Sequence, residues 1–420
     1  MHAPAKTPLF TPVLLAGALI LMLGFAVRAS FGVFQIPIAA EFGWPRAEFS
    51  LAIAIQNLAW GIGQPIFGAL AERFGDRRAI LLGALFYAVG LLASAHAMTP
   101  LAHQLLEILV GFGVAGTGFG VILAVVGRAS SDENRSLALG ITTAAGSAGQ
   151  VFGAPVAAAL LQVMPWQTIF MIFAAVILAS MAALPALRAP EDTADPTATG
   201  HPADPEPMGR TVARAFRDPS FTLIFLGFFS CGYQLAFVTA HFPALVTEMC
   251  GAVDPTGMLA ALGISSTSAL GAASIALIGL ANIAGTITAG WLGKRHSKKL
   301  LLAGIYALRT LIAAAFILAP ITPASVLLFS LLMGLLWLAT VPLTSGLVAQ
   351  IYGLRYMGTL YGFVFLSHQI GSFLGVWLGG LLYDIYGNYT LVWWVGVAVG
   401  AFSALVHLPV RETPRRFAPA

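Results

Sequence analysis

Long apolar stretches alternate with short polar turns along most of the chain. Each stretch stays apolar over about 20 residues, the length that a helix needs to cross the hydrocarbon core of a bilayer. A membrane β-barrel would instead alternate apolar and polar residues along shorter strands. We therefore predict an all-α membrane protein with twelve transmembrane helices, at 11–38, 50–71, 79–98, 102–126, 137–161, 167–187, 220–246, 268–292, 300–319, 323–348, 358–383 and 389–409. The first stretch is too long for the core of a secretory signal, so we expect it to be retained as helix 1.

Residues 189–219 form the one long polar interruption between these stretches. The segment APEDTADPTATGHPADPEPMG (189–209) is rich in Pro, Asp and Thr, a composition typical of a flexible linker. The next ten residues, RTVARAFRDP, have a basic amphipathic pattern that favours a short helix at the cytoplasmic membrane surface. The predicted domains are therefore an N-terminal six-helix bundle (1–188), a cytoplasmic linker with its amphipathic segment (189–219) and a C-terminal six-helix bundle (220–420).

The two predicted bundles repeat each other at an offset of 222 residues. Six residue pairs share this register, at corresponding topological positions: Gly63 and Gly285, Gly68 and Gly290, Arg73 and Arg295, Gly140 and Gly362, Gly149 and Gly371, and Gly153 and Gly375. Internal repeats of this kind build secondary transporters, which bind substrate near the membrane midplane between the halves. The pattern predicts two pseudo-symmetric six-helix bundles.

Composition and charge agree with a membrane protein and indicate its orientation. Hydrophobic residues make up 58% of the chain and charged residues 9%, whereas a soluble domain of this size needs far more charge on its surface. Of the 21 Lys and Arg residues, 18 lie in segments predicted to share one side, and only Arg46 lies on the other. Because cytoplasmic loops carry the excess of Lys and Arg, we expect a multi-pass protein of the bacterial cytoplasmic membrane with both termini in the cytoplasm. The net charge of +4 then needs no nucleic-acid partner.

Three charged residues lie well inside predicted helices: Arg28, Arg309 and Glu107. An arginine at a helix centre costs about 2.5–3.5 kcal/mol on insertion scales unless it is paired or hydrated. Two arginines and one acid leave the membrane interior with a surplus positive charge. An anionic substrate could neutralise that charge, so we predict a small-molecule carboxylate as the substrate.

Other chemistries are not indicated. Gly111-Phe-Gly113-Val-Ala-Gly116 matches the dinucleotide-binding pattern, but it lies within an apolar helix, where glycines allow close helix packing. The sequence has no phosphate-binding loop with a Lys, and its two cysteines, Cys231 and Cys250, are too few for a metal site. No nucleophile–base arrangement is evident. We therefore expect no cofactor, no metal, no ATP hydrolysis and no enzymatic activity.

The segment GALAERFGDRRAILLG (68–83) resembles the signature loop of the major facilitator superfamily, and GWLGKRHSKKLLLAG (290–304) is a weaker second copy. The family has an acid after Gly-x-Leu, which Glu72 supplies in the first copy, whereas the second copy has Lys294. The resemblance implies that these loops make contacts that form in one transport state and break in the other. The candidates for such gating contacts are Glu72, Arg73, Asp76, Arg77 and Arg295.

A second segment, SFGVFQIPIAAEFGWPRAEFSLAIAI (30–55), is similar to the bacterial monocarboxylate and oxalate–formate porter group. That resemblance implies a monocarboxylate as the substrate. One departure concerns helix 8, where animal monocarboxylate carriers place an Asp and an Arg one helical turn apart. The best match here has Asn282 and Thr286 instead, so the way those carriers couple protons to substrate is not implied.

The superfamily resemblance also implies that helix 1 lines a central cavity, which makes Arg28 the first candidate to bind substrate. Gln35 follows seven residues later on the same helical face. Aligning the prolines of helices 1 and 7 places Arg28 opposite Gln234 and Gln35 opposite His241. The alternative is that Arg28 extends to the interface or binds a backbone carbonyl.

Helices 9 and 10 supply further candidates for the substrate path. Helix 9 belongs to the outer ring of the family fold, so Arg309 either contacts substrate or braces the C-terminal bundle. In helix 10, Trp337 and Thr340 begin a polar–aromatic stripe that continues to Thr344 and Ser345. This stripe fits a cavity lining and a helix-packing surface equally well.

Three titratable residues are candidates for proton coupling: Glu107, His241 and His368. Glu107 occupies a position in helix 4 where a common family motif has an arginine, and it could instead pair with Arg28 or lie near the outer interface. Histidines titrate near physiological pH, but lone histidines in helices often serve in packing.

We therefore predict a secondary active transporter, a monomer in the lipid bilayer, that moves a small organic anion by alternating access, with a proton or a counter-anion as the coupled ion. Efflux of drugs or metabolites is the alternative within the same superfamily. A membrane sensor or scaffold would need an appended soluble domain, and the linker is too short and too polar to supply one.

Overall fold

The computed structural model describes residues 8–44, 46–187 and 207–414, and the side chains of all of these except 35, 36, 39, 46, 47, 49, 50 and 384. The helices before the linker are α1 (Pro12–Ser30), η1 (Phe31–Phe34), α2 (Gln35–Phe42), α3 (Arg46–Phe74), α4 (Asp76–Ser94), α5 (Pro100–Thr117), α6 (Phe119–Ala129), α7 (Asp132–Leu161), α8 (Trp166–Ser180) and η2 (Met181–Ala186), where η1 and η2 are 3₁₀ helices.

The helices after the linker are α9 (Met208–Arg217), α10 (Pro219–Met249), α11 (Met258–Ala261), α12 (Thr267–Leu292), α13 (Lys298–Leu318), α14 (Pro323–Leu336), α15 (Thr340–Tyr352), α16 (Met357–Tyr386) and α17 (Thr390–His407). The amphipathic segment after the linker is α9, in which Thr211 and Ala215 are buried while Arg210 and Arg217 are exposed. Its location at the membrane surface stays a prediction.

The predicted all-helical membrane fold is confirmed, and the described residues contain no strand. Eleven helices or directly continuing helix pairs are long and apolar enough to cross a membrane. The long helix that is absent from these eleven is α3, whose 29 residues suffice to span a bilayer. Its apolar surface is interrupted by three amide side chains, Gln56, Asn57 and Gln64. Each of these side chains forms a hydrogen bond that is described below.

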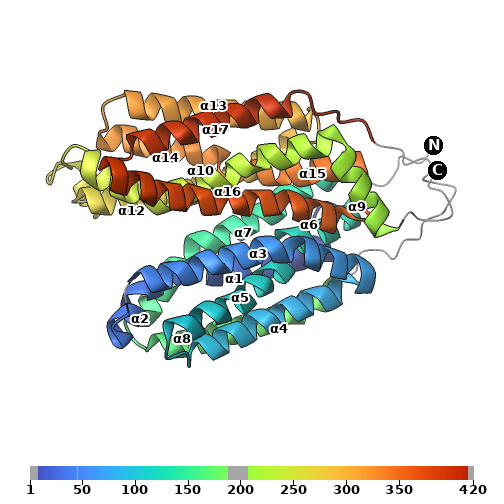
Figure 1. Ribbon diagram of the computed structural model, residues 1–420, viewed down its shortest axis with the longest axis horizontal. Helices are drawn as coiled ribbons and strands as arrows, with labels where there is room; N and C mark the ends of the chain where they lie inside the picture. Colours follow the sequence, from blue (N-terminus) through green and yellow to red (C-terminus); the bar gives the residue numbers. More distant parts are fainter. Residues whose placement is uncertain (1–7, 45, 188–206, 415–420) are drawn as a thin grey trace.

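The helices form two bundles that lie side by side, α1 to α8 in one and α10 to α17 in the other (Figure 1). Within the first bundle α1 packs on α7 and α3 on α5, and within the second α10 packs on α16 and α13 on α17. The bundles meet most extensively at two helix pairs, α3 with α16 and α7 with α12. We call these pairs the α3–α16 seam and the α7–α12 seam. The two ends of the molecule are named after α9 and α2, which lie at opposite ends in Figure 1.

Glycines allow the helices of both seams to cross at close distance. A Cβ atom on Gly68 of α3 would lie 2.5 Å from the backbone nitrogen of Thr359 at the start of α16. A Cβ atom on Gly140 of α7 would lie 3.0 Å from the Cα atom of Gly290 in α12. Gly68 and Gly290 are one of the repeated pairs at the offset of 222 residues. The repeat therefore places equivalent crossings in the two seams.

Four of the predicted helices are candidate membrane spans but not single α-helices. The predicted helix 167–187 consists of α8 and the 3₁₀ helix η2. The predicted helix 11–38 consists of α1, η1 and α2 and continues to Phe42. The predicted helix 102–126 is divided into α5 and α6, and 323–348 is divided into α14 and α15. Continuous apolar sequence hides such breaks, because hydrophobicity reports burial in the membrane and not the backbone hydrogen-bond pattern.

Amide side chains stabilise two of these breaks. At Gly118, between α5 and α6, the backbone is extended, and the N–H of Gly120 donates to Oε1 of Gln64 at 3.0 Å. Between α14 and α15, the N–H of Leu338 donates to Oδ1 of Asn282 at 2.8 Å. Buried backbone groups that lose their helical partner need another one. In both bundles a side chain of the equivalent helix, α3 or α12, supplies it.

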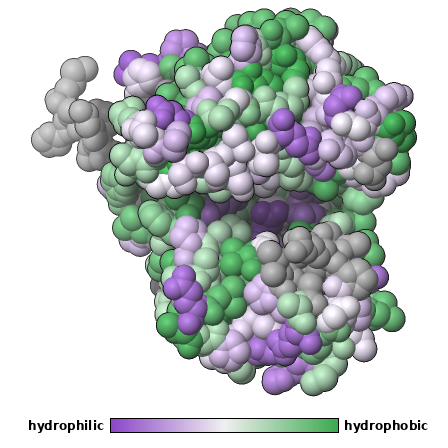
Figure 2. All heavy atoms as spheres, turned by 90° about the vertical axis from the view of Figure 1, so that its left-hand side faces the viewer, coloured by the Kyte–Doolittle hydropathy of each residue, from purple (hydrophilic) through white to green (hydrophobic). Residues whose placement is uncertain are grey.

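The α2 end is hollowed. Figure 2 looks onto this end and shows hydrophilic side chains at the bottom of a cleft between two lobes. Toward the α9 end the bundles are in contact across both seams, at Gly68 and at Gly290. The structure is therefore open between the bundles at one end and closed at the other.

Candidate functional site

Arg28 lies in the last turn of α1 and is half-buried. Its Nη2 donates a hydrogen bond of 2.6 Å to Oδ1 of Asn57 on α3. Nδ2 of Asn57 donates to the backbone oxygen of Ile53 at 3.0 Å, which fixes the amide with its oxygen toward the guanidinium. The guanidinium also lies over the ring of Trp60, 4.5 Å from the centroid, at a distance typical of a cation–π contact. Two neutral groups thus orient the cation.

No carboxylate pairs with Arg28 among the residues that the structure describes. Its Nε has no hydrogen-bond partner there either. Glu107, the acid considered above as its partner, is fully buried on α5 and accepts a hydrogen bond of 2.7 Å from Gln56. Its other oxygen lies 3.8 Å from Nε2 of His103. The interior acid and the interior cation of the first bundle therefore have separate environments.

An aromatic stack leads from Arg28 into the second bundle. The Trp60 ring lies 4.8 Å from the ring of Phe365 on α16, and the Phe365 ring stacks on His368 at 5.0 Å. Nδ1 of His368 faces Oε1 of Gln369 at 3.4 Å. The α3–α16 seam thus brings the candidate Arg28 and the candidate His368 to the two ends of one stack. Asn57, Trp60 and Phe365 complete this arrangement.

Arg309 has different surroundings. It lies on α13 and is fully buried inside the second bundle. Its Nη1 donates to Sγ of Cys231 at 3.7 Å, and its guanidinium lies 5.7 Å from the centroid of the Tyr306 ring. Thr340, at the start of α15, lies 3.2 Å from the same sulfur. Two candidates from the sequence, Arg309 and Thr340, therefore meet at a cysteine, within the bundle and not at the seam.

The alignment of helices 1 and 7 predicts Gln234 opposite Arg28, but the structure does not place it there. Gln234 donates a hydrogen bond of 3.0 Å to the backbone oxygen of Gly396 on α17 and borders a small apolar cavity inside the second bundle. Nε2 of His241 lies 3.0 Å from the backbone oxygen of Val376 on α16. The side chain of Gln35 lies outside the described part of the chain. A proline alignment fixes the height of a residue along a helix but not the direction of its side chain, which explains the result.

The stripe on helix 10 is interrupted by the break between α14 and α15. Trp337 ends α14 and is buried, and Thr340 begins α15. Ser345 donates back to the oxygen of Val341 at 2.9 Å within α15. Because residues 337–339 are not helical, Trp337 does not share a helical face with Thr340 and Thr344, which both lie on α15.

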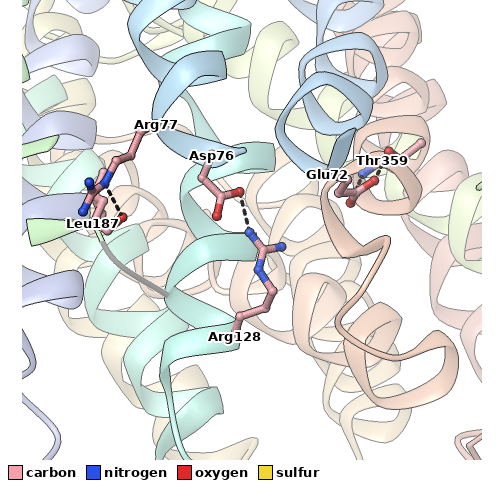
Figure 3. A network of polar contacts seen from close by, with 6 residues as sticks. All are labelled: Glu72, Asp76, Arg77, Arg128, Leu187 and Thr359. Carbon is pink, nitrogen blue, oxygen red and sulfur yellow. Dashed lines mark hydrogen bonds and ion pairs between the residues drawn. The ribbon is translucent and has the colours of Figure 1, made fainter. Parts of the chain in front are cut away.

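The gating candidates form three kinds of contact at the α9 end, shown in Figure 3. The carboxylate of Glu72 accepts hydrogen bonds from the backbone N–H of Thr359, at 3.0 Å, and from its hydroxyl, so it joins the bundles across the α3–α16 seam. Asp76 pairs with Arg128 at 2.5 Å, and Arg77 donates to the oxygen of Leu187 at 3.2 Å, both within the first bundle.

The two remaining gating candidates, Arg73 and Arg295, are exposed, and each lies over a neighbouring ring of its own helix region, Phe74 and Trp291. The α7–α12 seam is joined instead by Lys294, whose Nζ donates to Oδ1 of Asn134 at 3.2 Å. Lys294 occupies the position of Glu72 in the second copy of the repeat. Each copy thus uses this position to contact the other bundle, with the opposite charge.

Some residues of this site carry no sequence signal. Trp60 and Phe365 resemble the other apolar residues of membrane helices, and Cys231 indicates neither a metal site nor a disulfide framework. Asn57 was detectable, since an amide inside an apolar helix must bond to a partner or line a cavity. Helix packing, which the local sequence does not reveal, brings Trp60 next to Phe365 and Cys231 next to Arg309.

A family profile, the Major Facilitator Superfamily, matches residues 14–376 and 251–420. The chain is 26% identical over 401 residues to the uncharacterised MFS-type transporter YcxA of Bacillus subtilis (strain 168), covering 91% of this chain and 90% of that protein. It is 29% identical over 398 residues to monocarboxylate transporter 13 of Bos taurus, covering 92% and 86%. The Escherichia coli fucose:proton symporter FucP, solved in the outward conformation, has the same fold, with a TM-score of 0.71 at 17% identity over 93% of this chain and 97% of that one.

Proposed function

Because the chain belongs to the Major Facilitator Superfamily, we propose that it is a secondary active transporter of a small organic anion, a monocarboxylate, and that protons drive the transport. It acts as a monomer in the bacterial cytoplasmic membrane, with both termini in the cytoplasm. In this orientation the cleft of Figure 2 opens to the outer side and the seams close the cytoplasmic side.

The observation that supports the substrate class is the environment of Arg28. The guanidinium is oriented by Asn57 and Trp60, both neutral, and no described carboxylate neutralises it. A cation inside the membrane is costly unless it is paired or hydrated. A carboxylate can accept two parallel hydrogen bonds from a guanidinium, so a carboxylate substrate fits this position. The likeness to a bovine protein named monocarboxylate transporter 13 supports the same substrate class.

The transport cycle follows from the two seams. A substrate bound at Arg28 draws the walls of the cleft together on the α2 side. The contacts at the α9 end, Glu72 with Thr359 and Lys294 with Asn134, then break, and the site opens to the cytoplasm. Glu107, buried beside His103 and Gln56, binds the coupled proton. A neutral carboxylic acid there removes the buried negative charge while the cycle proceeds.

Uptake into liposomes tests the proposal. Purified protein is assayed with a panel of short radiolabelled carboxylates, with and without an inward proton gradient. We expect uptake of at least one monocarboxylate, stimulated by the gradient. Arg28→Ala should weaken apparent affinity roughly 10- to 100-fold, because a hydrogen bond to a charged group contributes about 1.5–3 kcal/mol.

Two control variants keep this test specific. Arg28→Lys keeps the charge but loses the planar pair of donors, so it should retain part of the activity. Arg210→Ala removes an exposed arginine of α9, away from the cleft and the seams, and should behave as wild type. Uptake that is equal in wild type and Arg28→Ala would remove Arg28 from the site. Transport of cationic or neutral compounds, with no carboxylate transported, would favour efflux instead.

A further inference from the structure

The charge of Arg309 has no carboxylate to balance it in the described chain. The residue is fully buried, and its Nε and Nη2 have no hydrogen-bond partner there. Arginine keeps its proton in proteins, so the side chain of Arg309 stays charged. A buried charge needs a counter-charge or hydrogen bonds that replace water. One group that can become an anion lies within hydrogen-bond distance, the thiol of Cys231, to which Nη1 donates at 3.7 Å.

Two hydrogen-bond donors surround the sulfur. Cys231 is fully buried on α10, so water does not compete for its hydrogen bonds. The hydroxyl of Thr340 lies 3.2 Å from the sulfur, and the guanidinium of Arg309 approaches from α13. Both groups can donate to a thiolate. A cysteine next to a cation ionises far more readily than a free one.

The other titratable groups around Cys231 come from α13 and α16. Tyr306 on α13, together with Tyr361 and His368 on α16, interacts electrostatically with the sulfur. The hydroxyl of Tyr361 has no hydrogen-bond partner among the described residues. On α17, the His407 ring stacks on Tyr306 at 5.2 Å, one side chain further from the sulfur. None of these groups is a carboxylate.

We propose that Cys231 is ionised at neutral pH and forms a buried thiolate–guanidinium pair with Arg309, so that its sulfur is a proton-binding site of the second bundle. When the thiol ionises, its proton leaves to bulk water, and the sulfur keeps the electron pair of the S–H bond. When a proton returns, the S–H bond forms again and Arg309 loses its counter-charge.

This site has a physical connection to the cleft. His368 interacts with Cys231 and stacks on Phe365, whose ring contacts Trp60 beneath Arg28. The backbone next to the cysteine is also held tightly, because a Cβ atom on Gly232 would collide with the backbone oxygen of His368. Protonation of Cys231 therefore changes the charge next to His368 on α16, one of the two helices of the α3–α16 seam. The pair exists whether or not the transported compound is an anion.

The test uses the ultraviolet absorption of the thiolate in purified full-length protein without substrate. The chain has two cysteines, so a Cys250→Ser variant isolates Cys231, and the Cys231→Ser/Cys250→Ser variant supplies the blank. We expect the difference spectrum to show one thiolate per chain at neutral pH, which acidification removes. Arg309→Met, in the Cys250→Ser background, should move this titration up toward the ordinary thiol pKa of about 8.5.

Three results would overturn the proposal. A thiolate band that appears only above about pH 8.5 would show an ordinary thiol. A neutral-pH band that is unchanged in Arg309→Met would remove the arginine as its cause. If Arg309→Met does not fold, Arg309→Lys takes its place. This variant keeps the charge beside Cys231, so a thiol titration equal to that of the denatured protein would reject the pair. All of these results leave the assignment of Arg28 untouched, because no transport is measured.

Discussion

Arg28 and Arg309 carry the same group in two different surroundings. Arg28 ends the first helix of the first bundle, is half-buried, and touches an amide and an indole ring on the neighbouring helix. Arg309 lies mid-helix in the second bundle, is fully buried, and donates to a thiol. Neither forms an ion pair with a carboxylate among the described residues. Each cation therefore needs another source of negative charge.

The partners of the two arginines differ in whether they can ionise, and this decides where each negative counter-charge comes from. The partners of Arg28, Asn57 and Trp60, cannot ionise, so a negative charge has to arrive from the cleft. Arg309 is enclosed, and its partner Cys231 can lose a proton, so the charge can be generated in place. A cation left open to a cleft suits a ligand that comes and goes, whereas a sealed pair suits a permanent part of the fold. The predictions below separate these two roles.

The largest expected effect concerns stability in the second bundle. Cys231→Ala leaves the guanidinium of Arg309 buried without a counter-charge, which should cost about 3–5 kcal/mol. Arg309→Met should cost much less, because the thiolate then takes up a proton and becomes a neutral, apolar-compatible thiol. Thermal unfolding of the purified variants in detergent measures both changes.

Cys250→Ala is the matched control, since this half-buried cysteine at the end of α10 lies outside the cluster. It should unfold at nearly the wild-type temperature. A Cys231→Ala protein as stable as Arg309→Met would contradict the charge pair and leave ordinary packing as the account of this site.

The sequence indicates the surroundings of Arg28 better than those of Arg309. The helices, the repeat and the surplus charge follow from local patterns. Four of the repeated glycines, Gly68, Gly140, Gly290 and Gly362, lie at crossing points of the seams, because only a glycine permits such close backbones. Cys231 and Arg309 are 78 residues apart, and no local pattern relates them. The break at Gly118 is equally hidden, because its backbone partner is the side chain of Gln64 on another helix.

The second prediction supplies Arg28 with a carboxylate from the protein itself. Asn57→Asp keeps the shape of the side chain but places a carboxylate where Oδ1 now lies, 2.6 Å from Nη2 of Arg28. The cation is then neutralised from within, so the apparent affinity for a carboxylate should fall roughly 10- to 100-fold, from the loss of about 1.5–3 kcal/mol. Concentration-dependent uptake in liposomes measures it.

Asn388→Asp, in an exposed loop, makes the same chemical change away from the site and should leave uptake unaltered. The unfolding temperature of Asn57→Asp should stay at or above the wild-type value, since the new ion pair is favourable. If Asn57→Asp binds the carboxylate with wild-type affinity, no substrate anion depends on Arg28. The two arginines would then differ in their surroundings but not in substrate binding.

The smallest effect comes from the ring beneath Arg28. Trp60→Leu removes the cation–π contact, worth about 1 kcal/mol at a partly exposed site, so affinity should fall about fivefold. Trp60→Phe keeps an aromatic face under the guanidinium and against Phe365, so it should recover most of that loss. Trp377→Leu removes an exposed tryptophan from α16 and serves as the control in the same uptake assay. Equal losses in Trp60→Leu and Trp60→Phe would assign the effect to the indole N–H, which has no hydrogen-bond partner in the described structure and could then donate to the substrate itself. In either outcome Trp60 acts at the cleft, where the negative counter-charge of Arg28 has to come from a bound ligand. The buried pair of Arg309 and Cys231 is unchanged in these variants.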